Sequence, residues 1–196
     1  MAQPRLFAVP LPAGFDYRAE VLEAHEERAL VGTLRDVPFQ EFEFHGFLGR
    51  RRVLFYGWRY DFGGGGLQPA EPIPDFLLPL RERAAAFAAL PPEQLQQVLL
   101  TEYQPGAPIG WHRDRPVFEK VVGVSLGSPA ILRFRRRKPG GFDRASLAVE
   151  PSSAYLLTDE VRHQWEHSIA PGDRLRFSIT FRTLSELGRR KAAEVP

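Results

Sequence analysis

The sequence predicts an α+β domain in which two helices support antiparallel strands that form a sandwich or barrel. Helix-like segments are confined to the first half of the chain. Short apolar or alternating runs, separated by proline and glycine, fill the second half. The 196 residues, 43% of them hydrophobic, are enough for one domain with one sizeable core and marginal for two.

Two segments carry helix signals. The first spans residues 17–30, with Asp16 as the candidate N-cap. The second spans residues 75–90, where Pro79 falls in the first turn, whose amides have no intrahelical partner in any case. Pro91 follows and ends this helix. The two helices therefore precede the strand-rich half of the chain.

Six strands are expected after these helices, because turn signals such as Pro139-Gly140 recur between them. They are residues 98–103, 121–126, 130–137, 146–150, 154–157 and 174–183. In the last strand, polar and apolar residues alternate from Arg174 to Arg182, so one face is apolar and buried. The polar face meets either water, as in a sandwich, or a barrel interior, where an arginine could bind a dicarboxylate.

Composition excludes several classes of protein. The chain has no cysteine, so it can form no disulfide, zinc ribbon, iron–sulfur cluster or thiol nucleophile, and any metal must be held by histidine and carboxylate. No run reaches the roughly 18 to 20 apolar residues of a membrane span, and the first residues lack a secretory signal pattern. We therefore expect a soluble, cytoplasmic protein.

A His-x-Asp motif is the first candidate for chemistry. In an extended segment, His112 and Asp114 point to the same face and can both bind one ion. His163 or His167 could supply a third ligand from a neighbouring strand. Two histidines and one carboxylate form the facial triad of non-haem Fe(II) oxygenases. Taken alone, the motif is weak and more typical of a solvated or hydrogen-bonded surface pair.

Several motifs between residues 98 and 184 together resemble the AlkB-type family of Fe(II)- and 2-oxoglutarate-dependent dioxygenases. In chain order they are Thr101-Glu102-Tyr103-Gln104-Pro105-Gly106-Ala107, His112-x-Asp114, Val122-Gly123-Val124-Ser125-Leu126-Gly127, His167-Ser168-Ile169 and Arg176-x5-Arg182. Each motif is weak alone, but their order and spacing are specific. The resemblance covers close to half of the chain.

The resemblance implies a ligand set for Fe(II): His112, Asp114 and His167. His163 lacks the Ser-Ile that follows His167, so we expect it to lie in a neighbouring turn.

The resemblance also implies a binding set for the co-substrate. Arg176 matches the arginine that binds the distal carboxylate of 2-oxoglutarate, and Arg182 matches a second arginine near the metal. Tyr103 and Thr101 match positions that hydrogen-bond the co-substrate. Thr101 departs from the asparagine of the bacterial repair enzymes.

The implied fold is a double-stranded β-helix, or jelly roll, with supporting N-terminal helices. Residues 1–196 would form one dioxygenase domain: 1–97 helical support and a substrate lid, 98–184 the catalytic core, and 185–196 a basic tail. The implied reaction uses Fe(II), 2-oxoglutarate and dioxygen, and releases succinate and CO2. It hydroxylates a C–H bond, often of an N-methyl group that then leaves as formaldehyde.

Residues 50–62 interleave basic and aromatic side chains before four glycines, Gly63 to Gly66. Tyr56, Trp58 and Tyr60 would share one face of an extended strand. In the nucleic-acid members of the family, such a segment is a lid that stacks on an extruded base, and the glycines would be its hinge. The alternative is a hairpin whose aromatic rings pack on the core.

Charge is distributed unevenly although the net charge is only +2. Residues 133–138 contain five cations in six positions, and Arg133 and Arg135 share a strand face that could contact phosphates. The alternative is an ordinary solvated surface.

The substrate side carries one departure from the family. Pro116 stands where the repair enzymes usually carry a second acid that reads the base edge. We expect a monomer that demethylates N-alkylated bases in nucleic acid, single strands in preference to duplex. The alternatives are a demethylase or hydroxylase of protein side chains or small molecules and, less favoured, a non-catalytic nucleic-acid-binding module.

Overall fold

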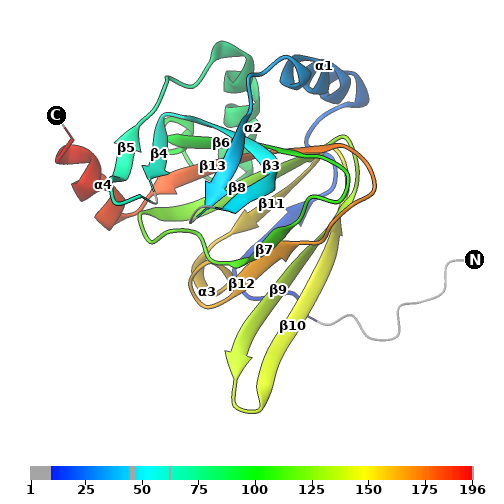
Figure 1. Ribbon diagram of the computed structural model, residues 1–196, viewed down its shortest axis with the longest axis vertical. Helices are drawn as coiled ribbons and strands as arrows, with labels where there is room; N and C mark the ends of the chain where they lie inside the picture. Colours follow the sequence, from blue (N-terminus) through cyan, green and yellow to red (C-terminus); the bar gives the residue numbers. More distant parts are fainter. Residues whose placement is uncertain (1–9, 45–46, 62, 196) are drawn as a thin grey trace, which may run out of the picture.

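The computed structural model describes residues 10–44, 47–61 and 63–195, and its strands form two antiparallel sheets and a separate hairpin (Figure 1). The large sheet has the order β1 (Phe15–Arg18), β11 (Ser153–Leu157), β8 (Phe118–Leu126), β13 (Arg176–Leu184), β6 (Gln97–Tyr103), β3 (Phe47–Tyr56), β2 (Gln40–Phe44). The small sheet has the order β10 (Gly141–Val149), β9 (Ala130–Lys138), β12 (Glu166–Ile169), β7 (Ile109–His112). The hairpin pairs β4 (Trp58–Asp61) with β5 (Gly66–Pro69).

The large sheet separates two hydrophobic cores. One core lies between this sheet and the helices and includes Phe177, Ile179 and Phe181 of β13. The other lies on the opposite face and includes Phe134 of β9. Since all of β13 is buried, its polar positions do not face water. The alternation predicted for this strand is confirmed, and its polar face lines the interior between the sheets.

The first helix begins later than the sequence predicts. Residues 15–18 form β1 and pair with β11, with Phe15 opposite Leu157. Helix α1 spans Ala24–Arg35, and Glu23, not Asp16, is its N-cap in a reciprocal capping box with Glu26. Local helix signals before Glu23 are overridden because pairing with β11 brings the ring of Phe15 to 5.1 Å from that of Phe134.

The second helix matches its prediction closely. A 3-10 turn, η1 (Asp75–Leu77), leads into α2 (Leu78–Phe87), and Pro79 lies in the first turn of α2. A further 3-10 turn, η2 (Pro92–Gln94), follows. The helices cover the outer face of the large sheet, where Leu77, Leu80 and Leu34 of α1 are buried (Figure 1).

The predicted lid segment, residues 50–62, is divided between two strands. The prediction that Tyr56, Trp58 and Tyr60 share one strand face is therefore wrong. Strand β3 ends at Tyr56, and Gly57, at φ 72°, turns the chain into β4. A Cβ at Gly57 would lie 2.0 Å from the Gln96 carbonyl oxygen, so only glycine fits. The glycine stretch forms the β4–β5 turn, where Asp61 accepts hydrogen bonds from the amides of Gly63 and Gly65. The side chain of Arg50, and Phe62, lie outside the described residues.

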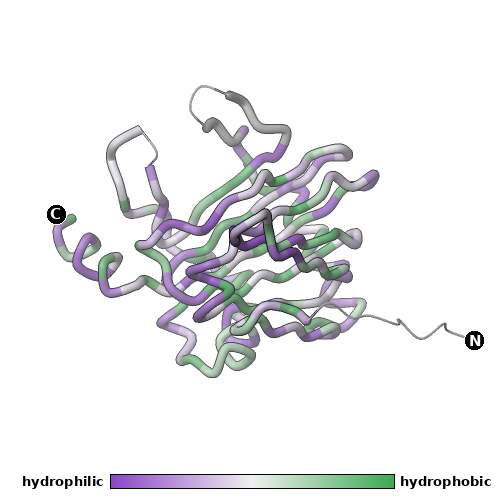
Figure 2. Tube along the Cα trace, turned by 90° about the horizontal axis from the view of Figure 1, so that it is seen from below, coloured by the Kyte–Doolittle hydropathy of each residue, from purple (hydrophilic) through white to green (hydrophobic). Residues whose placement is uncertain are grey.

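The segments on either side of the predicted catalytic core, residues 1–97 and 185–196, form more regular structure than the helices and tail that the sequence predicts. Residues before 98 add β1, β2 and β3 to the large sheet. The expected basic tail forms α4 (Glu186–Ala193), capped by the Ser185 hydroxyl, which accepts from the Gly188 amide. Figure 2 shows this helix next to the C-terminus with hydrophilic and hydrophobic residues mixed along it. One short helix, α3 (Asp159–His163), joins β11 to β12.

Candidate metal centre and its surroundings

Three side chains from two strands and a loop meet at the inner face of the small sheet. His167 of β12 lies directly opposite His112 of β7, and the centroids of their rings are 4.3 Å apart. Asp114 follows His112 in the next loop. One ligand atom of each residue lies within 4.8 Å of the others. The structure therefore brings together the three residues that the sequence selected as metal ligands.

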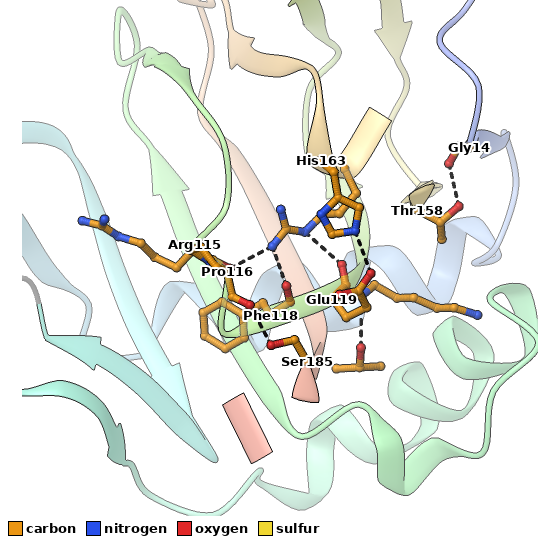
Figure 3. Close-up of polar contacts among 11 residues, drawn as sticks. Gly14, Arg115, Pro116, Phe118, Glu119, Thr158, His163 and Ser185 are labelled. Carbon is orange, nitrogen blue, oxygen red and sulfur yellow. Dashed lines mark hydrogen bonds and ion pairs between the residues drawn. The ribbon is translucent and has the colours of Figure 1, made fainter. Parts of the chain in front are cut away.

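His163, the rival third ligand, is held elsewhere. It ends α3, and its Nε2 lies 2.8 Å from Glu119 Oε1 (Figure 3). Its backbone carbonyl accepts from Arg113 Nη1. His163 thus belongs to a surface contact and not to the His112, Asp114 and His167 cluster.

Hydrogen bonds leave ligand atoms available in this cluster. His112 Nδ1 lies 2.9 Å from the Gly110 carbonyl oxygen, which can only accept, so this nitrogen carries the proton and Nε2 keeps its lone pair. Asp114 Oδ1 accepts from Arg182 Nη2 at 3.0 Å. Asp114 Oδ2 is buried, and no described residue hydrogen-bonds to it. A buried carboxylate oxygen without a partner indicates a missing ligand.

Protonation states in the cluster suit a cation. Burial lowers the pKa of His167 to about 3, and the neighbouring His112 adds to this effect, so the ring is neutral. Burial alone would raise the pKa of Asp114, but the positive charge of Arg182 outweighs this effect and holds the pKa well below its usual range. Neutral imidazoles and an ionised carboxylate are the forms that bind a divalent metal.

The residues present therefore fit Fe(II). Two imidazole nitrogens and one carboxylate oxygen on one face are the donor set of non-haem iron sites, which leave other coordination positions open.

Arg162 of α3 holds the loop that follows Asp114. This buried guanidinium donates to the backbone carbonyls of Arg115, Phe118 and Glu119 at 2.5 to 2.9 Å (Figure 3). The Ser185 hydroxyl donates to the carbonyl of the intervening Pro116. Three bonds from one rigid fork fix the loop, and with it the position of Asp114. Sequence reasoning missed Arg162, because a cation that binds only backbone leaves no motif.

A second unsatisfied group lies at Arg176. Its side chain is buried, its Nε donates to Ser125 Oγ at 3.2 Å, and its Cζ lies 4.7 Å from the centre of the Tyr103 ring. No described residue accepts from its Nη1 or Nη2. A buried planar fork with two free donors fits a carboxylate held in a bidentate pair. Thr101 and Tyr103 line the cavity in front of the metal cluster, as the expected role in co-substrate binding requires.

Arg182 is held at the metal side of this cavity. Besides Asp114, it binds Gln97, whose Oε1 accepts from Arg182 Nη1 at 2.9 Å. Gln97 is buried and was missed by sequence reasoning. The available signal was its spacing, since Gln97, Leu99, Thr101 and Tyr103 alternate along β6 and all line the cavity.

The Val-Gly-Val-Ser-Leu-Gly motif has a packing explanation. Gly123 of β8 lies opposite Tyr155 of β11, and a Cβ at Gly123 would lie 2.2 Å from the Tyr155 ring. The missing side chain therefore makes room for a tyrosine that lines the cavity. Burial raises the pKa of Tyr155 to about 12, so its hydroxyl stays protonated. Ser125, two residues on, binds Arg176.

We expect Gly123→Ala to destabilise the protein by about 1 to 3 kcal/mol, because the new methyl group overlaps a buried ring. Chemical unfolding measures the free energy. Gly172→Ala is the matched control, since a Cβ there meets nothing within 4 Å, and it should be neutral. Equal stability of the two variants would contradict this account of Gly123.

Of the three aromatic residues predicted to stack on a substrate, only Tyr60 lines the cavity. Tyr56 packs against the helix-side core, and Trp58 packs against Leu67 and its neighbours at the β4–β5 hairpin. The alternative hairpin interpretation therefore holds for Tyr56 and Trp58. Strand pairing decided this outcome, because the turn at Gly57 moves Trp58 and Tyr60 onto a different strand from Tyr56.

Arg133 and Arg135, predicted to contact phosphates, have partners within the protein. Their guanidinium carbons lie 5.2 and 4.6 Å from the centre of the Trp111 ring. Arg133 Nε donates to Ser168 Oγ, and Arg135 Nε donates to Glu166 Oε2. The indole thus ties the edge strand β7 across β12 to β9. Both arginines brace the strands that carry His112 and His167, so phosphate contact is not needed to explain them.

Comparisons with known proteins agree with this geometry. A family model described as the 2OG-Fe(II) oxygenase superfamily matches residues 62–182. The "Uncharacterized protein L905" of Acanthamoeba polyphaga mimivirus is 29% identical over 150 residues, which are 69% of this chain and 70% of that protein. The "Probable RNA/DNA demethylase ALKBH6" of Danio rerio is 37% identical over 111 residues, 51% of this chain and 47% of that protein.

The "Alkylated DNA repair protein ALKBH8 homolog" of Arabidopsis thaliana is 29% identical over 149 residues, 62% of this chain. This chain spans only 42% of that relative's length.

Two solved structures share the fold. That of OsALKBH1 aligns with a TM-score of 0.65 at 17% identity, covering 89% of this chain and 100% of that chain. That of a Pseudomonas putida prolyl-4-hydroxylase aligns with a TM-score of 0.60 at 17% identity, covering 88% and 93%. These likenesses confirm the predicted double-stranded β-helix. Within the described residues, no helix has the length and apolar character that a bilayer crossing requires.

Proposed function

Because the chain belongs to the 2OG-Fe(II) oxygenase superfamily, as one of its AlkB-type members, we propose that it oxidatively removes alkyl groups from nitrogen atoms of bases in nucleic acid. Single strands are its preferred form, and residues 1–196 act as one dioxygenase domain. The protein is a 2-oxoglutarate-dependent dioxygenase that uses Fe(II), 2-oxoglutarate and dioxygen.

Each part of the site has a role in this reaction. His112, Asp114 and His167 would hold the iron, which when bound supplies the redox chemistry that couples oxidation of 2-oxoglutarate to hydroxylation of a substrate C–H bond. Arg176 binds the distal carboxylate of the co-substrate through its two free donors. Arg182 holds Asp114 as an ionised ligand at 3.0 Å.

The observation that carries the nucleic-acid proposal is the ring of Tyr60 on the wall of the cavity that contains the metal cluster. Phe55 and Phe118 line the same cavity. An alkylated base that leaves its stack needs an aromatic surface of this kind and a site that excludes water. Two relatives carry names that refer to DNA repair or to RNA/DNA demethylation, which supports the same substrate class.

The test measures release of formaldehyde and succinate by the iron-loaded enzyme with 2-oxoglutarate. Methylated single strands, the same strands in duplex, methyl-lysine peptides and methylated nucleosides serve as substrates. We expect turnover on the single strands, with affinity that falls steeply with salt because phosphate contacts release counterions. Turnover on peptides alone would place the chain with demethylases of protein side chains.

Substitution of Tyr60 tests the stacking role. We expect Tyr60→Leu to lower kcat/KM on a methylated strand by the equivalent of about 1 to 3 kcal/mol, the usual contribution of one stacked base. Tyr60→Phe keeps the ring and should retain activity. Equal losses in both variants would assign the effect to the hydroxyl and contradict stacking.

A further inference from the structure

Tyr155 brings a further hydroxyl group to the cavity that contains the metal cluster. Its side chain lines this cavity, and the residue is only 7% exposed. No described residue forms a hydrogen bond with its hydroxyl. The ring stacks on Phe15 with 6.5 Å between the ring centres, but a phenylalanine would make the same contact. Packing therefore explains the ring of Tyr155 and leaves its hydroxyl without a role.

Strand pairing determines where this hydroxyl lies. Tyr155 of β11 is paired with Gly123 of β8, and Gly123 is paired on its other side with Thr180 of β13. The atoms nearest to a Cβ built at Gly123 are Cζ and the hydroxyl oxygen of Tyr155, at the far end of the ring. The ring therefore extends across Gly123 toward β13, and its hydroxyl lies over β8 in the interior between the two sheets.

The side chain of Arg176 reaches the same face of β8 from the opposite direction. Its Nε donates to the hydroxyl oxygen of Ser125, which lies two residues beyond Gly123. Alternate residues of a strand share a face, so the guanidinium group of Arg176 and the hydroxyl of Tyr155 lie over neighbouring positions of one strand. Both outer nitrogens of this guanidinium group are buried without an acceptor among the described residues.

Electrostatics place the hydroxyl at the Arg176 end of the cavity and keep it a donor. Burial has the largest effect on the pKa of Tyr155 and raises it to about 12, so the hydroxyl keeps its proton at neutral pH. Among the ionised side chains, Arg176 influences this pKa more than Asp114 or Arg182 at the metal end does. A carboxylate has about four acceptor sites, so two bonds from Arg176 leave sites for another donor.

We propose that the Tyr155 hydroxyl donates a hydrogen bond to the carboxylate of 2-oxoglutarate that Arg176 binds, and that residue 123 is glycine because any side chain there would displace this hydroxyl. The inference rests on the proposed function in its use of 2-oxoglutarate, and it adds a binding residue to the same site. It holds whichever substrate is oxidised, because the contact is made to the co-substrate.

The test uses Tyr155→Phe, which removes the hydroxyl and keeps the ring. Anaerobic calorimetry on the iron-loaded protein should show a dissociation constant for 2-oxoglutarate that is raised about tenfold or more, as expected for loss of a hydrogen bond to a charged group. The affinity for Fe(II) should not change. Tyr17→Phe is the matched control, because Tyr17 is paired with Tyr155 in the sheet but its hydroxyl accepts from the Glu150 amide outside the cavity. It should bind 2-oxoglutarate as the unchanged protein does.

A double variant tests the part of the proposal that concerns Gly123. Gly123→Ala should also weaken 2-oxoglutarate binding, and adding Tyr155→Phe should then cost less than about threefold more, because the hydroxyl is already displaced. Gly172→Ala should have no effect. Circular dichroism verifies that each variant is folded. If the two losses multiplied in full, the role assigned to Gly123 would be wrong.

The remaining outcomes separate this inference from the proposed function. Unchanged affinity for 2-oxoglutarate in Tyr155→Phe would overturn the inference and leave the proposed function intact. The same conclusion would follow if the variant raised only the KM for a methylated strand, because the hydroxyl would then contact the substrate. Failure of the unchanged, iron-loaded protein to bind 2-oxoglutarate would overturn both.

Discussion

Replacing His112 with alanine should abolish iron-dependent turnover of 2-oxoglutarate and leave a folded protein. His112 is a half-buried side chain whose loss removes a ligand and little core volume. The effect should exceed the 10- to 100-fold losses that follow removal of groups which merely orient metal ligands. Succinate release measures turnover, and calorimetry under anaerobic conditions measures Fe(II) affinity.

Asp114→Asn gives a second test of the same centre. The amide oxygen can still accept from Arg182, but the negative charge that the metal needs is lost, so Fe(II) affinity should fall as it does for His112→Ala. His163→Ala is the control, because His163 contacts Glu119 outside the cluster, and it should keep full affinity. If His163→Ala lost iron while His167→Ala kept it, the ligand assignment would be wrong.

Arg176→Lys should weaken 2-oxoglutarate binding by about 1.5 to 3 kcal/mol, the range of hydrogen bonds to charged groups. Lysine keeps the positive charge but lacks the planar fork, so it cannot hold a carboxylate through two parallel bonds and also bind Ser125. Anaerobic calorimetry with Fe(II) and 2-oxoglutarate measures this loss directly.

Arg174→Lys is the matched control for that experiment. The sequence predicts that Arg174 begins the last strand, on the same face as Arg176. The structure places it before β13, exposed and near Asp173, so its substitution should leave affinity unchanged. Unchanged binding in Arg176→Lys would contradict the role of the buried fork.

Much of the core follows from local pattern. Alternation along β13 predicts one apolar face, and that face packs against the helices. The two-residue spacing of His112 and Asp114 brings both side chains to the candidate metal cluster, because side chains two residues apart in an extended segment point to the same face. The distinction between His167 and His163 came from the residues that follow each of them, and the structure separates the two in the same way.

The residues expected to contact the substrate are predicted less well by the sequence. Tyr56, Trp58 and Tyr60 have equal spacing and equal chemistry, yet only Tyr60 lines the cavity. The turn at Gly57 decides this, and that turn depends on the close approach of Gln96 from a distant segment. Likewise, the basic cluster at residues 133–138 predicts a free basic surface. In the structure, two of its arginines have partners within the protein: Arg133 contacts Trp111 and Ser168, and Arg135 binds Glu166.

By itself, the sequence determined the strand-rich class and the donor types, because these depend on side-chain chemistry and on periodicity along the chain. The full set of metal and co-substrate residues was implied by the resemblance of its motifs, in their order and spacing, to a known family. The tertiary structure alone decided which polar groups would be left without a partner: Asp114 Oδ2 and the two outer nitrogens of Arg176. It also decided that Gln97 and Arg162 would support the site. These facts depend on contacts between residues far apart in the chain, since hydrogen-bond partners and burial are set only when the two sheets meet.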